Sequence, residues 1–326
     1  MLTNRPPIKH DASDWSPADQ AGFLQSLMQA GNGEIKLASE GATSYTKRIL
    51  REASFFPALL KLQPIDLTKL RRVTSQSSGV PSEIGYIEVE MEPGSPGSRT
   101  APFSASPDFN TYRGEVYYIY LSKDDTPELY KNVDQLATYQ MDLRQVITDN
   151  LLKDLDNVAD YRIIQTHKDI TGSDPNAVGP GGYQQYQEVN GGITRQTYKS
   201  TLLPLINAQL NNGVFLINRQ TAVEFCGWGR DEIGGDLAER ILQDGINALE
   251  SFKFNGVPHI ATIKSALIGT NHVYHFTYQD FLGRAYEMQQ PTVYVKRERD
   301  TIYVYASRKY GYGIGNVAGV ARTVFN

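Results

Sequence analysis

The sequence predicts an α+β protein built around one long helix, with a strand-rich segment before it and a mixed lobe after it. Apolar residues recur at helical spacing from Thr126 to His167, and no glycine or proline follows Pro127 within this stretch. Before it, apolar and acidic residues alternate through Ile87–Glu92, which is the period of a strand. After it, helical and strand patterns alternate between about residues 194 and 283, which favours a compact α/β lobe.

The composition is that of a globular chain, because 40% of the 326 residues are hydrophobic. The net charge of −4 argues against a protein that coats nucleic acid through bulk charge. The single cysteine, Cys226, excludes an intrachain disulfide and fits a reducing compartment. No apolar run approaches the roughly 18–20 residues that span a bilayer, and the first residues lack a signal peptide's apolar segment. We therefore expect no membrane partner.

Residues 1–65 are predicted to form an N-terminal arm with a polar, proline-containing start. A short helix is expected within residues 44–60, where Pro57 should break or kink it. The basic residues of this helix favour a solvated face over a contact to nucleic acid; they are Lys47, Arg48 and Arg51.

Residues 66–122 are predicted to form an extended β-hairpin. Its first strand has an apolar face and an acidic face that carries Glu88, Glu90 and Glu92. Its second strand spans Glu115–Leu121, and a tract rich in glycine, serine and proline forms the tip. A two-stranded ribbon is marginal in water, so this hairpin must lie on another surface. Because no later segment offers a matching sheet, a neighbouring subunit is the expected support.

The long helix is predicted to begin at Thr126, which reads as a cap followed by a proline in the first turn and an early acid. A helix of about 40 residues would be roughly 60 Å long. An average globular helix has only about 11–12 residues. The acids of the helix, including Asp156 and Asp160, are expected to face solvent. Such a helix would be a central element to which the other parts of the chain attach.

A flexible connector is expected at residues 173–182, followed by the lobe. A helix over Thr194–Leu210 should be kinked by Pro204. A glycine-flanked loop, Gly227–Gly235, follows and carries three side chains of interest, Trp228, Arg230 and Asp231. Strands are expected at Val214–Asn218, Ala266–Ile268 and His272–Thr277, and a strand, a turn and a second strand are expected within Phe252–Ile260. Beyond the lobe, antiparallel strands return on either side of a polar turn at Arg297–Asp300.

The sequence contains no convincing motif for catalysis, for a cofactor or for a metal. Gly313–Ala318 matches a loose dinucleotide-binding pattern, but too few residues follow it for the helix that the pattern requires. His272 and His275 are three apart in a strand, so they point to opposite faces and are poor co-ligands. Cys226 is expected to be packed rather than nucleophilic. We therefore predict a protein that is not an enzyme.

The order of arm, hairpin, long helix, α/β lobe and final strands resembles the major capsid proteins of tailed double-stranded DNA bacteriophages, whose fold encapsulins share. The resemblance covers nearly the whole chain and rests on architecture; Phe254–Pro258 and Tyr310–Arg322 look familiar without being diagnostic. It implies the phage capsid fold in four parts. These are an N-terminal arm (1–65), an extended hairpin or E-loop (66–122), a peripheral domain with a spine helix (123–171 and 284–326) and an α/β axial domain (172–283).

The resemblance implies a structural protein whose copies form the pentamers and hexamers of an icosahedral shell around double-stranded DNA. It implies location in the virion, with assembly in the host cytoplasm. The expected partners are further copies of the chain, a separate scaffolding protein, a portal, a decoration protein and packaged DNA on the inner face.

Candidate contacts between subunits follow from the hairpin and from the glycine-flanked loop. The acidic hairpin face would need basic partners, for which Arg71, Arg72 and Arg99 are the candidates. Trp228, Arg230 and Asp231 would lie near a capsomer axis. Some family members cross-link through a hairpin lysine, but Ser75–Ser122 contains no lysine. A non-covalent shell is therefore expected.

Two alternatives stay open at this point. The first is an encapsulin-type shell that stores cargo proteins, which the long hairpin and arm disfavour weakly. The second is an α+β enzyme with a pocket in the lobe, for which the sequence offers no nucleophile, base or metal set.

Overall fold

The computed structural model describes residues 52–75, 82–92, 114–132, 143–228 and 250–326, together with residues 237, 239 and 241. Most of the predicted arm and the predicted hairpin tip lie outside these residues. The described chain divides into two compact units. The first contains residues of 123–159 and 289–309, and the second contains residues of 55–122, 160–288 and 310–326. Each unit is described below by itself.

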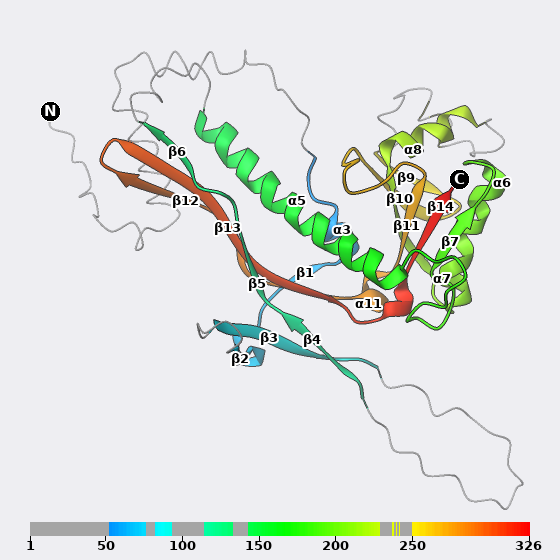
Figure 1. Ribbon diagram of the computed structural model, residues 1–326, viewed down its shortest axis with the longest axis horizontal. Coiled ribbons are helices and arrows are strands. Elements are labelled where there is room, and N and C mark those ends of the chain that lie inside the picture. Colours follow the sequence, from blue (N-terminus) through cyan, green and yellow to red (C-terminus); the bar gives the residue numbers. More distant parts are fainter. Residues whose placement is uncertain are drawn as a thin grey trace, which may run out of the picture. The chain divides into compact units, whose positions relative to one another are not determined.

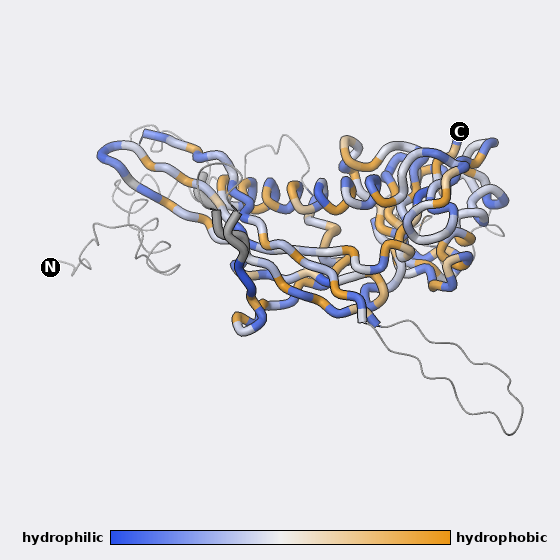
Figure 2. The backbone as a smooth tube through the Cα atoms, turned by 60° about the horizontal axis from the view of Figure 1, so that its bottom comes forward, coloured by the Kyte–Doolittle hydropathy of each residue, from blue (hydrophilic) through white to orange (hydrophobic). Residues whose placement is uncertain are grey.

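The long helix is α5, which spans Leu143–Thr171 and has 29 residues. Buried side chains occur at every fourth residue of α5 and form one stripe along it, as the apolar spacing predicts. The stripe consists of Leu151, Leu155, Ala159, Ile163, His167 and Thr171. Hydrophobic and hydrophilic colours accordingly alternate along its turns in Figure 2. Val158, predicted to be inside, is 38% exposed.

The predicted start of this helix at Thr126 is wrong. Thr126 and Ala306 exchange hydrogen bonds, from the Thr126 amide to the Ala306 carbonyl (2.9 Å) and from the Ala306 amide to Thr126 Oγ1 (2.9 Å). The chain then continues as strand β6 (Leu129–Asn132), in which Tyr130 pairs with Tyr303 of strand β13 (Thr301–Ile314). A side chain that could cap a helix therefore completes a sheet instead, and residues 133–142 lie outside the described chain.

Three sheets accompany the helix (Figure 1). In the first, the order is β1-β12-β13-β5, with β6 also on β13. Its other strands are β1 (Leu62–Pro64), β5 (Ser122–Asp125), β12 (Gly283–Glu298) and β13 (Thr301–Ile314). The second sheet consists of β2 (Arg71–Ser75), β3 (Ser82–Glu90) and β4 (Val116–Tyr120), in that order. The predicted two-stranded hairpin is thus three-stranded.

The third sheet forms the lobe and has the order β7-β14-β11-β8-β10-β9. Its strands are β7 (Tyr186–Val189), β8 (Asn212–Asn218), β9 (Ser251–Phe254), β10 (Val257–Thr262), β11 (His272–Thr277) and β14 (Val320–Phe325). Aromatic side chains dominate the core on one face, among them Tyr198, Phe215 and Phe225. Because β14 lies in this sheet, the last described strand belongs with strands of the predicted axial domain. The four-part domain division stays a prediction.

Short helices connect the strands of the second unit. They are α3 (Phe56–Leu59), α6 (Arg195–Tyr198), α7 (Leu203–Asn207), α8 (Arg219–Val223) and α11 (Gln279–Leu282). Pro57 and Pro204 each occupy the first turn of such a helix, where a missing N–H does no harm. Within the described chain, the prediction that Pro57 breaks a helix is wrong, because Pro57 lies in the first turn of α3, which begins at Phe56.

Two other local predictions fail for identifiable reasons. Residues 266–268, expected as a strand, form a turn in which the Leu267 and Ile268 amides donate to the Lys264 carbonyl. The connector at 173–182 is not loose. The buried Gln185 side chain accepts from the Gly181 amide (2.8 Å) and donates to the Val320 carbonyl (2.8 Å), which ties the connector to β14.

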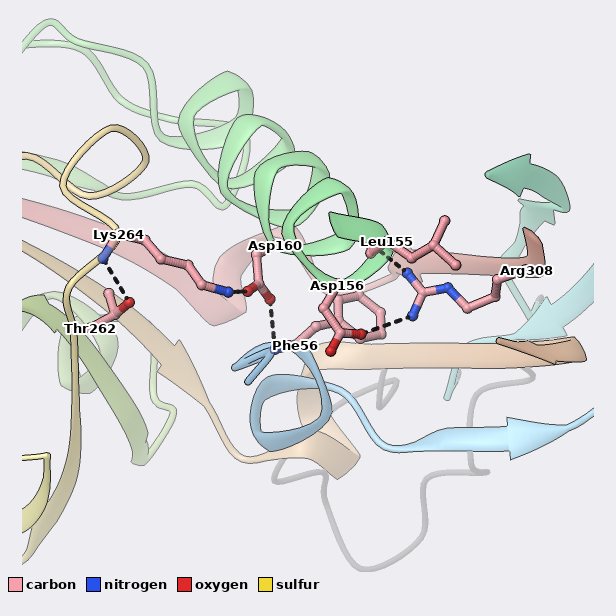
Figure 3. Close-up of polar contacts among 7 residues, drawn as sticks. All are labelled: Phe56, Leu155, Asp156, Asp160, Thr262, Lys264 and Arg308. Carbon is pink, nitrogen blue, oxygen red and sulfur yellow. Dashed lines mark hydrogen bonds and ion pairs between the residues drawn. The ribbon is translucent and has the colours of Figure 1, made fainter. Parts of the chain in front are cut away.

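Buried polar contacts hold each part of α5 within its own unit (Figure 3). In the first unit, the Arg308 guanidinium donates to the Leu155 carbonyl (3.1 Å) and lies 3.7 Å from Asp156 and 3.9 Å from Asp124. Arg308 and Asp124 are each 4% exposed, so these charges neutralise one another in the interior.

In the second unit, the Asp160 carboxylate is fully buried, although it was predicted to face solvent. Its Oδ2 lies 2.5 Å from Lys264 Nζ, and its Oδ1 accepts from the Phe56 amide (3.0 Å). Figure 3 shows the Lys264 and Asp160 side chains pointing toward one another. The local sequence around Asp160 gave no hint of burial, because its partners are each 104 residues away.

Three histidines of the second unit are fully buried. His167 lies between the rings of Tyr274 and Phe276 and donates through Nε2 to the His275 carbonyl (3.3 Å). The His259 ring donates to the Val257 carbonyl (2.8 Å), and its other nitrogen accepts from the Tyr198 hydroxyl (2.8 Å). Burial lowers the pKa of His167 to about 3 and that of His259 to about 4, and it lowers the His275 pKa as well.

These histidines make stability depend on pH. Their pKa values in the folded state lie below the unfolded value of about 6.5, so the unfolded state binds more protons below that pH. Stability is therefore full above about pH 6.5 and falls by about 1.4 kcal/mol per pH unit for each imidazole as the pH drops. We expect the melting temperature of unassembled protein to fall by several degrees between pH 7.5 and 5.5. An unchanged melting temperature over this range would contradict the prediction.

Candidate subunit-contact surface

The sheet formed by β2, β3 and β4 has two chemically different faces. In the register, Tyr86 of β3 lies opposite Tyr120 of β4, Glu88 opposite Tyr118, and Glu90 opposite Val116. These alternate with Ile87 and Val89, which lie opposite Ile119 and Tyr117. Because side chains alternate along a strand, the first set occupies one face and the second set the other.

The inner face packs on the chain's own glycine-rich segment. A Cβ atom at Gly313 would lie 3.0 Å from Ile119, and one at Gly315 would lie 2.6 Å from the Tyr117 ring. At Gly311 it would lie 2.5 Å from the Tyr120 carbonyl oxygen. Because Gly311, Gly313 and Gly315 lack side chains, the hairpin can pack closely against one side of the β13 segment. The prediction that no later segment supports the hairpin is wrong.

On the outer face, which we call the hairpin face, every residue is exposed except the half-buried Tyr86; the face consists of Tyr86, Glu88, Glu90, Val116, Tyr118 and Tyr120. Val116, Tyr118 and Tyr120 are 44%, 51% and 58% exposed, which is unusual for three large neighbouring side chains. The Tyr86 ring touches those of Tyr118 and Tyr120, with centroids 5.6 and 6.0 Å apart, so the aromatic group is continuous.

The residues predicted to contact a neighbouring subunit differ in their exposure and in their contacts within the chain. Glu88, Glu90 and Glu92 are exposed as predicted, but Glu88 has a partner in its own chain, because Arg71 Nε lies 3.7 Å from its carboxylate. Arg72 is also exposed. Three other predicted residues, Arg99, Arg230 and Asp231, lie outside the described chain.

Trp228 packs against the core of its own lobe. Its ring centroid lies 4.4 Å from that of Phe225 and 5.5 Å from that of Phe254. Its contact to a neighbouring subunit stays a prediction. The tyrosines of the hairpin face were not among the predicted contacts. Their period of two within Val116–Tyr120 was the available signal.

The side chains that the sequence singled out for chemistry can be located in the described residues. They contain no group of three or more His, Cys, Asp or Glu side chains that could hold a metal ion. Cys226, predicted to be packed, is exposed. His272 and His275 lie on opposite faces of β11, and His275 is occupied by a hydrogen bond to Thr323 (2.9 Å). Within the described chain, no helix is both long and apolar enough to cross a membrane.

Comparison with known proteins gives matches in structure but not in sequence. No family model and no curated protein matches the chain. A chain of Microbacterium phage Oxtober96 superposes with a TM-score of 0.58 at 11% identity, over 95% of this chain and 99% of that chain. The capsid of a native GTA particle gives 0.56 at 13% identity, over 86% and 93%. The mature capsid of bacteriophage PhiM1 gives 0.55 at 10% identity, over 87% and 90%.

These matches cover nearly the whole length of the compared chains, and two of the three structures are described as capsids. The chain therefore has the phage capsid fold, as its order of parts predicts. At these identities the likeness establishes the fold alone.

The glycine support under the hairpin can be tested by adding one methyl group. Gly311→Ala places a Cβ against the Tyr120 backbone, which cannot rotate away, so we expect a loss of about 1–3 kcal/mol in the free energy of unfolding. Gly114→Ala is the matched control, because no atom lies within 4 Å of that Cβ, and it should stay within about 0.5 kcal/mol of wild type. Denaturant unfolding measures both, and equal stability of the two variants would refute the support.

Proposed function

We propose that this protein is the major structural subunit of a phage-type capsid, whose copies self-assemble into an icosahedral shell around double-stranded DNA. The observation that carries the proposal is the phage capsid fold over nearly the whole chain. The hairpin face supports it, because a monomer gains nothing by exposing three large side chains beside a row of acids. Burial of such faces between copies would drive assembly, with no reaction catalysed.

The finer parts of this proposal concern partners and location. Copies form pentamers and hexamers, and the shell belongs to the virion and is assembled in the host cytoplasm. A separate scaffolding protein and a portal take part, and a decoration protein and the packaged DNA contact the finished shell. Because Ser75–Ser122 contains no lysine, the hairpin supplies no amine for a covalent cross-link. The phage and GTA structures above offer no argument for a cargo-storing encapsulin.

Assembly is the direct test of the proposed function. We expect the purified protein, alone or with a co-expressed scaffolding protein, to form closed shells or capsomer rings by negative-stain electron microscopy and size-exclusion chromatography. A monomer or dimer that persists at high concentration under both conditions would overturn the proposal.

The three acidic residues Glu88, Glu90 and Glu92, which we call the acidic row, allow a test by mutation. Reversing it with Glu88→Lys, Glu90→Lys and Glu92→Lys should reduce the yield of shells strongly, because like charges would then meet at the subunit contact. The melting temperature of the unassembled variant should change little, since exposed charges contribute little to monomer stability. Shell yield and monomer melting are measured side by side. Normal shells from this variant would remove the acidic row from the interface.

A further inference from the structure

The lobe carries a second exposed surface that the fold leaves uncovered. Residues 195–207 are helical throughout, as α6, the 3₁₀ turn Lys199–Leu202 and α7. Tyr198, Thr201 and Leu205 point into the core. Four exposed residues of this run form what we call the lobe face, namely Arg195, Lys199, Leu203 and Ile206.

The lobe face is basic at one end and aliphatic at the other. Leu203 and Ile206 are 52% and 54% exposed, and exposing two adjacent aliphatic side chains to water is energetically unfavourable. From 189 to 223 the sequence contains no aspartate or glutamate. Arg219, the remaining cation of this stretch, pairs with Glu250 (3.2 Å). Within the described chain, neither Arg195 nor Lys199 forms an ion pair.

The hairpin face complements the lobe face, because it has an acidic end and an aromatic end where the lobe face has a basic end and an aliphatic end. Its aromatic end contains Tyr86, Tyr118 and Tyr120, and its acidic end contains Glu90, with Glu92 two residues further on. Glu90 and Glu92 form no ion pair with any described residue. From Tyr86 to Glu92 an extended chain covers about 20 Å, and from Arg195 to Ile206 the helical run with its 3₁₀ turn covers about 18 Å. The two surfaces therefore match in length, charge and apolar content.

We infer that the hairpin face of one copy docks on the lobe face of a second copy, with Glu90 and Glu92 against Arg195 and Lys199 and the tyrosines over Leu203 and Ile206. Both surfaces are exposed in one chain, so they do not cover each other within it. The occupant must also recur once per subunit, and a second copy satisfies this without any other protein. The inference rests on the proposed function, because it names the surfaces through which copies of the shell meet.

A charge swap tests this contact. The hairpin variant is Glu90→Lys with Glu92→Lys, and the lobe variant is Arg195→Glu with Lys199→Glu. Each alone should lower the yield of shells at least about tenfold, since a repulsion of about 1.4 kcal/mol per contact suffices for that factor. The combined variant restores opposite charges across the contact and should recover shells to within about threefold of wild type.

Control variants carry charge reversals outside the two faces, each at one residue and so with half the change in net charge of the corresponding double variant. They are Glu115→Lys, which is exposed beside β4, and Lys253→Glu, which is exposed on β9; both should assemble normally. Circular-dichroism melting of every unassembled variant checks that the chain has folded.

The outcomes separate the inference from the proposed function. If wild type forms shells and the combined variant is no better than the single ones, this pairing of surfaces is wrong while the shell function stands. Normal assembly of either single variant overturns the pairing as well. If wild type never assembles, with or without a scaffolding protein, both the shell function and the pairing fall.

Discussion

The second unit depends on one buried negative charge. Asp160 is fully buried, and its carboxylate binds Lys264 from the lobe and the Phe56 amide from the segment that precedes β1. A carboxylate out of water is tolerated only when cations and N–H groups replace its hydration, and removing one partner of such a pair costs about 3–5 kcal/mol. Three segments more than a hundred residues apart are therefore held at one point of α5 by charge as well as by packing.

The hairpin illustrates how one strand pattern serves two purposes. Tyr117 and Ile119 fit against the glycines of the β13 segment, so their face is occupied within the chain. The intervening Tyr118 and Tyr120 are left outside with the acids of β3. The glycine segment therefore covers only one of the two faces of the hairpin. It fixes which face of the hairpin remains outward.

The sequence predicted what local patterns encode. The α+β class, the order of parts, the buried stripe of α5 and the exposure of Glu88, Glu90 and Glu92 all follow from periods of two or four residues. The start of α5 was missed because Thr126 and Pro127 fit a helix start and a sheet edge equally well, and Ala306 decides between them. The burial of Asp160 and the glycine support were missed because their partners are distant in the chain. The hairpin tyrosines were missed because the sequence does not show which face of β4 is covered, and so whether Tyr117 or Tyr118 is the more exposed.

The position of β14 bears on the order in which the lobe folds during synthesis. β14 lies between β7 and β11, and its pairing of Arg322 with Tyr186 joins residues 136 positions apart. Until β14 emerges from the ribosome, β7 has no neighbour in the sheet, and β11 has an open edge. Such distant pairing is slow to form. A nascent chain therefore completes its lobe only after its hairpin, long helix and β8–β11 are already made.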